Sequence, residues 1–204
     1  MNFFELVTYG MVGIGLAASC GFRVFVPMLF MSVAVHVGSL ILADGWEWIG
    51  SWPALAAFGV ATLVEVCGFF IPWLDNLLDA AATPAAVIGG ILATTACVSQ
   101  ADPVLAWSFG IIAGGGAAAV VQSGTVLARG TSTATTGGAG NFLVAGGELV
   151  GATVTSILAI VAPLLACLLF AVFAAMTAWL FVRWRRKRRM ALAAVETDSR
   201  GSVA

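Results

Sequence analysis

Long apolar runs, interrupted by a few charges and by Pro and Gly, divide almost the whole chain into segments of membrane-spanning length. A helix rises about 1.5 Å per residue and the bilayer hydrocarbon is about 30 Å thick, so one crossing needs about 20 mainly apolar residues. The candidate crossings cover residues 5–20, 24–41, 53–71, 84–101, 103–128, 142–161 and 163–182. The pattern predicts an all-α fold, a polytopic bundle of about seven transmembrane helices.

Several boundaries rest on local signals. GLAASCGFR at 15–23 predicts either a link between two crossings or a break within one re-entrant segment, so the count ranges from five to seven. The uncharged run 149–182 is too long for one span and predicts a hairpin at VAP, residues 161–163. Thr83 and Pro84 predict a helix start. The polar, Gly-rich stretch 130–140 predicts a flexible loop.

Composition supports the membrane assignment. Of 204 residues, 61% are hydrophobic and 9% are charged, whereas a soluble domain is about half apolar and about a quarter charged. The mean hydropathy is +1.04. This length fits one helical domain over residues 1–190, and the polar tail 191–204 is expected to be disordered and cytoplasmic.

Basic residues set the expected orientation. FVRWRRKRRM at 181–190 follows the last apolar run, and such clusters stay in the cytoplasm. Counting back through seven crossings puts the N-terminus outside and brings Arg23 and Arg129 to inner ends, which agrees independently with the positive-inside rule. The loop 44–52, DGWEWIGSW, then lies outside, where its tryptophans suit an interfacial belt. The expected location is a cytoplasmic (inner) membrane.

Ionisable residues are rare in the apolar runs, and the seven-crossing order brings them to similar depth near the cytoplasmic side. A charge at membrane depth is costly unless it is paired or hydrated, so it marks a candidate site. The residues concerned are Arg23, Glu65, Asp75, Asp79, Arg129 and Glu148. We expect them to share one inward-facing aqueous vestibule, in which arginines and carboxylates are partners.

The candidates differ in how well a structural role explains them. Glu65 lies within an uncharged apolar run, which favours its interpretation as a functional acid. Arg23 suits a guanidinium held inside the bundle against Glu65 or against a substrate anion. Asp75 and Asp79 share one helix face, which suits an interfacial helix with acids in water or a cation or proton site. For Glu148, a functional acid and an ordinary acid near the end of a span are equally supported. For Arg129, a secondary candidate, a positive-inside anchor is favoured.

The absence of known motifs argues against several classes of function. The cysteines lack CxxC spacing, so a metal site is not expected. No catalytic or phosphate-loop signature occurs, so no enzymatic activity, cofactor or nucleic-acid partner is expected. Small residues recur at Gly13, Ala17 and Gly21 and at Gly110 and Gly114, a pattern that predicts close helix packing within one chain or in a homo-oligomer.

Three stretches resemble a family of bacterial integral membrane proteins known as domain of unknown function 4126. They are GLAASCGFRVFVPML at 15–29, LVEVCGFFIPWLDNLLDAAATP at 63–84 and the Gly-rich segment before QSGTVLARG at 122–130. The resemblance implies an all-helical membrane protein, with matching positions at Arg23, Glu65, Asp75 and Asp79. It implies no activity, and it is weaker after Gly124, where Arg129 and Glu148 lie.

The charges at membrane depth favour a transporter or channel for a small solute or ion, with proton coupling through Glu65 and Arg23 as its partner. The alternative is a non-transporting membrane scaffold or lipid-binding protein whose charges only fix helix packing. The expected partners are the lipid bilayer and an unknown small solute or ion.

Overall fold

The computed structural model describes residues 3–68, 72–98 and 102–201, with side chains except at 3, 72–80, 184 and 186–201. The described residues form helices and no strands, which confirms the all-α prediction. In chain order the elements are α1 (Phe3–Cys20), α2 (Phe25–His36), the 3-10 helix η1 (Glu47–Gly50), α3 (Trp52–Cys67), α4 (Pro72–Cys97), α5 (Pro103–Phe109), the π-helix η3 (Gly110–Gly115), α6 (Gly116–Thr136), α7 (Asn141–Val161) and α8 (Pro163–Gly201).

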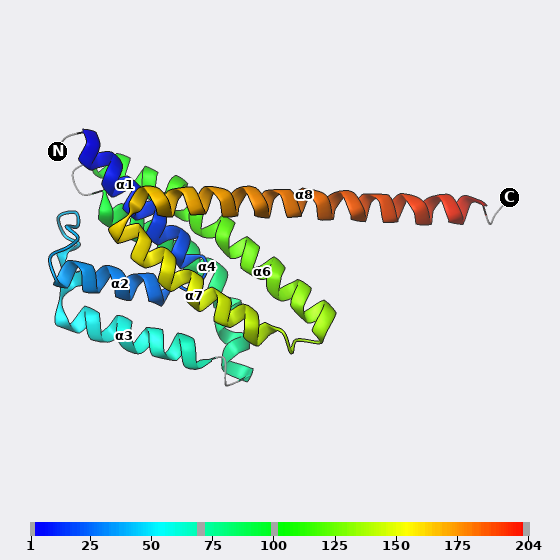
Figure 1. The fold of residues 1–204 in the computed structure, drawn as a ribbon, viewed down its shortest axis with the longest axis horizontal. Coiled ribbons are helices and arrows are strands. Elements are labelled where there is room, and N and C mark those ends of the chain that lie inside the picture. The colour runs from blue at the N-terminus through cyan, green and yellow to red at the C-terminus, as the bar shows by residue number, and fades with distance from the viewer. Residues whose placement is uncertain (1–2, 69–71, 99–101, 202–204) are drawn as a thin grey trace.

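The helices α5, η3 and α6 follow one another without a break and form one continuous rod. With these three counted as one, successive helical rods run in alternating directions (Figure 1). The start of α1 and the α2–α3 connection lie at one end of the bundle, and the α1–α2 and α6–α7 connections, with the end of α3, lie toward the other. The long helix α8 leaves the bundle at this second end and extends away from it as far as Gly201. Residues far apart in sequence therefore meet at the second end.

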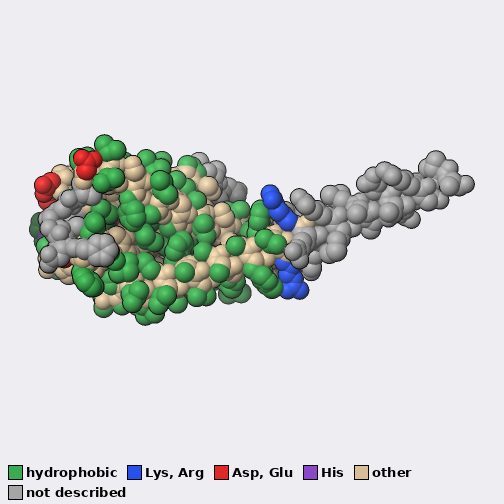
Figure 2. Space-filling view, turned by 90° about the horizontal axis from the view of Figure 1, so that it is seen from above, with side chains coloured by type: hydrophobic (Ala, Val, Ile, Leu, Met, Phe, Trp, Pro, Cys, Tyr) green, Lys and Arg blue, Asp and Glu red, His purple; other side chains and the backbone are tan. Residues whose placement is uncertain are grey.

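Three helical segments are long and apolar enough to cross a membrane, namely Pro103–Thr136, Asn141–Val161 and Pro163–Arg183. The other apolar helices in the described ranges are shorter, and α2 has only 12 residues, a rise of about 18 Å. On the face shown in Figure 2, hydrophobic side chains predominate between an end that carries acidic side chains and a part of α8 that carries basic ones. We call this part of α8, around Arg183 and Arg185, the α8 neck. These features are those of a membrane protein.

Small residues let α1, α4 and η3 approach one another closely, as the glycine spacing predicts. A Cβ atom on Gly13 would lie 2.9 Å from the Cα of Thr94, and one on Gly90 would lie 2.8 Å from the carbonyl oxygen of Gly114. Thr94 donates a hydrogen bond of 3.0 Å to the carbonyl of Gly13, so the α1–α4 contact is polar as well as close. Backbone proximity of this kind is the usual basis of helix packing in membranes.

Two predicted boundaries are wrong. No helix begins at Pro84, since α4 runs through it from Pro72 to Cys97. A proline removes one backbone hydrogen bond, and the turns on either side keep theirs. Residues 130–136 form the end of α6 rather than a loop. Their hydroxyl groups find partners within the helix, as Thr136 donates to the Ser132 carbonyl one turn earlier at 2.7 Å.

The C-terminal segment also extends a helix. Where residues 191–204 were expected to be a disordered tail, α8 continues as a helix to Gly201. The sequence MALAAVE at 190–196 consists largely of strong helix formers, which favours this continuation.

Candidate functional site

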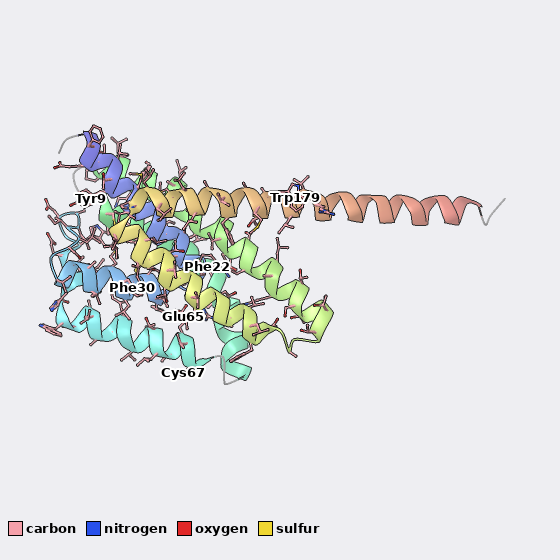
Figure 3. All side chains as sticks on the ribbon, viewed as in Figure 1. Tyr9, Phe22, Phe30, Glu65, Cys67 and Trp179 are labelled. Atoms are coloured by element: carbon pink, nitrogen blue, oxygen red, sulfur yellow. The ribbon has the colours of Figure 1, made fainter. Side chains whose placement is uncertain are left out.

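A pocket of about 400 Å³ lies where α1 ends and α2 begins. Four of the six candidate residues line it: Arg23, Glu65, Arg129 and Glu148. The complete lining is Cys20, Phe22, Arg23, Val24, Phe25, Glu65, Ala81, Ala82, Ala85, Gln122, Thr125, Val126, Arg129 and Glu148. Figure 3 shows Phe22 and Glu65 at the same end of the bundle, far from Tyr9 near the start of α1. The structure thus brings these four residues together.

Glu148 on α7 is the centre of the charged contacts. Arg129 on α6 donates from Nε to Oε1 at 2.9 Å and from Nη2 to Oε2, a bidentate pair. Arg23 donates from Nη2 to the same Oε2 at 3.2 Å. The exposed side-chain fractions are 5% for Glu148, 7% for Arg23 and 16% for Arg129. One buried carboxylate therefore joins two arginines and ties α6 and α7 to the α1–α2 connection.

Glu65 on α3 has a different role from Glu148. Its carboxylate accepts backbone N–H bonds from Val24 at 2.9 Å and from Phe25 at 3.1 Å. These groups open α2, and a helix N-terminus carries unpaired N–H donors and a partial positive charge that a carboxylate offsets. Arg23 reaches the backbone carbonyl of Glu65, with Nη1 at 3.5 Å. Arg23 forms an ion pair with Glu148 and also contacts the backbone of Glu65, the acid that was expected to be its partner.

Gly21 explains why the chain can turn at this point. A Cβ atom there would lie 2.6 Å from the carbonyl oxygen of Ala118 and 2.5 Å from the Cβ of Val121, both on α6. Without a side chain, the end of α1 lies directly against α6. Arg23 follows two residues later, and its N–H still donates to the carbonyl of Ser19 at 3.1 Å. The guanidinium is therefore carried on the first turn after α1, between α3 and α7.

The family model described as Domain of unknown function (DUF4126) matches residues 11–183, a range that includes every residue lining the pocket. The chain belongs to this family. The resemblance inferred from the three sequence stretches is confirmed. No curated protein and no solved structure matches the chain.

Among the lining residues of this DUF4126 chain that were not predicted as site residues, Gln122 and Thr125 carry an amide and a hydroxyl. They lie on the face of α6 that also carries Arg129, at spacings of three and four residues. Gln122 is 8% exposed, and its carboxamide has no hydrogen-bond partner among the described residues. Thr125 is 6% exposed and donates to the carbonyl of Gln122 at 2.9 Å. The available signal was a carboxamide in an apolar run two helical turns before Arg129.

The remaining candidates are placed only in part. Asp75 and Asp79 lie four residues apart on α4, and their side chains are outside the described ones. Within the described part of the chain, no group of three or more His, Cys, Asp or Glu residues could hold a metal ion. Cys20 lines the pocket, whereas Cys97 is buried elsewhere.

Proposed function

We propose that this protein is a membrane transporter or channel for a small solute or ion, and that the solute binds in the pocket. The observation that carries the proposal is Gln122, a residue 8% exposed on the wall of a 400 Å³ pocket, whose carboxamide bonds to no described residue and borders the pocket. Buried polar groups are costly unless water or a ligand bonds to them. Ionisable groups at membrane depth usually face such a cavity or pathway, and this volume suits a small molecule.

The lining indicates what kind of solute would fit. Its described charges balance, with Arg23 and Arg129 against Glu65 and Glu148. Gln122 adds a group that both donates and accepts, beside the apolar surfaces of neighbouring aromatic side chains. This combination favours a small polar molecule over a bare ion. Proton coupling through Glu65 or Glu148 belongs to the same proposal, because both carboxylates border the pocket.

The proposed topology has seven crossings, an external N-terminus and a cytoplasmic C-terminus in the bacterial inner membrane. It is supported by the alternating rods and by basic residues at the α8 neck with acids at the opposite end. The short helix α2 would be completed by the chain after it, where Leu40 and Leu42 are buried and Ala43 N–H donates to the Ala96 carbonyl at 2.8 Å. Irregular backbone is tolerated at membrane depth when protein covers it.

A second candidate function also has a specific observation behind it. Glu65 caps α2 and Glu148 joins two arginines, so both acids hold helices together. A non-transporting scaffold needs no more than this. Gln122 separates the two proposals, because its side-chain carboxamide bonds to no described residue and a scaffold has no use for that amide.

The test is Gln122→Leu in proteoliposomes, with osmotic swelling followed by light scattering in a panel of urea, glycerol, glycine and acetate. We expect at least one solute to enter faster than into protein-free liposomes. The variant should lower that rate about tenfold, since one lost hydrogen bond is worth about 1.4 kcal/mol. Its thermal stability should be unchanged or higher, because leucine has a similar size and removes an unpaired polar group.

Ser123→Leu is the matched control. Ser123 is exposed on the neighbouring position of α6, and its hydroxyl bonds only within its own helix, to the Ala119 carbonyl at 2.7 Å. It should leave swelling unchanged. A protein-dependent flux that Gln122→Leu does not alter would remove the pocket from the pathway, and no flux of any panel solute would favour the scaffold.

A further inference from the structure

A second hollow, of about 1030 Å³, lies between α6 and α8. Small residues line its α6 side, among them Gly124, Ala128 and Gly130, and large apolar residues such as Phe173 and Leu180 line its α8 side. The two helices touch at Gly124, where a Cβ atom would lie 2.8 Å from the ring of Phe173. Beyond this contact they diverge (Figure 1). The result is an apolar groove, closed at Gly124 and open toward the α8 neck.

We propose that this groove binds one anionic phospholipid, with an acyl chain along its floor and the phosphate at Arg183. The lining of α6 extends from Gly124 to Ala134, about 15 Å of helix. The hydrocarbon core of a bilayer is about 30 Å thick, so this length equals the depth of one leaflet. The proposal uses the membrane placement of α8 and is independent of transport.

The open end of the groove carries the charge that an anionic headgroup requires. Arg183 lines this end, and its guanidinium stacks over the Trp179 ring at 5.1 Å from the centroid. Tryptophan belongs at the headgroup level, so the contact holds the cation at that depth. More basic residues follow on α8, namely Arg185, Arg186, Lys187, Arg188 and Arg189. A phosphate at this point meets the Arg183 guanidinium while its acyl chain meets apolar side chains, and the basic sequence that follows favours an anionic headgroup.

Arg185 provides a matched comparison for Arg183. It stacks over Phe181 at 4.7 Å and does not line the groove. Two residues along a helix turn its direction by about 200°, so the two arginines leave α8 in different directions, and Arg185 meets the groove only through the ring of Phe181, a lining residue. Neutralising either one changes the net charge equally, and only Arg183 borders the groove.

The experiment is native mass spectrometry of the delipidated full-length protein, titrated with phosphatidylglycerol or with phosphatidylcholine of the same acyl chains. We expect one site that prefers phosphatidylglycerol. Arg183→Gln should weaken its binding about fivefold, the effect of one interfacial cation, and remove the preference, while Arg185→Gln should change it much less. Gly130→Phe should weaken both lipids, because a Cβ there meets no protein atom within 4 Å and the ring would fill the groove.

Gly59→Phe on α3, where a Cβ also meets nothing within 4 Å, controls for the added ring and should bind both lipids as the parent does. Equal binding of the two lipids would overturn the proposal. Equal losses from the two arginine variants would do so too, since they would indicate diffuse attraction, and so would unchanged binding by Gly130→Phe. Gln122→Leu should leave lipid binding intact, so a failed solute pocket and a failed lipid groove give different results.

Discussion

Replacing Glu148 with Gln should lower the free energy of unfolding by about 3 to 5 kcal/mol, because it leaves two arginines beside a neutral amide. Glu148 and Arg23 are 5% and 7% exposed, so the protein shields both from most water. Arg129, at 16%, is better hydrated, which moves the expected loss toward the lower limit. Thermal unfolding in detergent micelles measures the effect.

The companion variants are Arg129→Gln and the double variant with Glu148→Gln. Because the two side chains form a bidentate pair, removing both should cost less than the sum of the single losses. Strictly additive losses would mean that the contact adds nothing to stability.

Gly114→Ala should lower the free energy of unfolding by about 1 to 3 kcal/mol, the usual cost of overpacking. A Cβ atom at this position would lie 2.5 Å from the Gly90 carbonyl oxygen, and it would also meet the Thr94 hydroxyl. Both partners are on α4, so the substitution would push the π-helix η3 away from it. Thermal unfolding again gives the measurement.

Gly116→Ala makes the same substitution two residues later, where a Cβ atom meets nothing within 4 Å. There alanine should raise stability by up to about 1 kcal/mol, through its greater helix propensity. Equal effects at the two positions would show that the close approach of η3 to α4 does not limit packing.

The convergence of charges was predictable because it depends on depth alone. The count of apolar runs predicts the direction in which each segment crosses the membrane. These directions place four ionisable residues at one end of the bundle, namely Arg23, Glu65, Arg129 and Glu148. Close packing at the glycines followed from their spacing in the same way. Both inferences use only the order of residues along helices of known rise.

Partner choice was not predictable, because it depends on how each helix is rotated about its axis. Arg23 could reach more than one acid at its depth, and only the packed structure gives it Glu148. The role of Glu65 depends on the start of α2, which the break after Gly21 sets. The prediction of a helix start at Pro84 was wrong for a related reason, since helix packing can compensate for the one backbone hydrogen bond that a proline removes. Gln122 carries no charge, so the cost of an ionised group at membrane depth does not mark it.

The most direct test of the proposed site is whether water reaches it from the cytoplasm. Thr125→Cys, in a chain with its native cysteines replaced, introduces a thiol of similar size on the pocket wall. A chain that keeps only Cys97, which is 0% exposed and outside the pocket, is the dry control. We predict that a small, charged methanethiosulfonate modifies position 125 in inside-out vesicles and not in right-side-out vesicles, and leaves Cys97 unmodified until the protein is denatured. A thiol at position 125 that stays unmodified from both sides, or reacts from the outside, would contradict an inward-facing solute pocket.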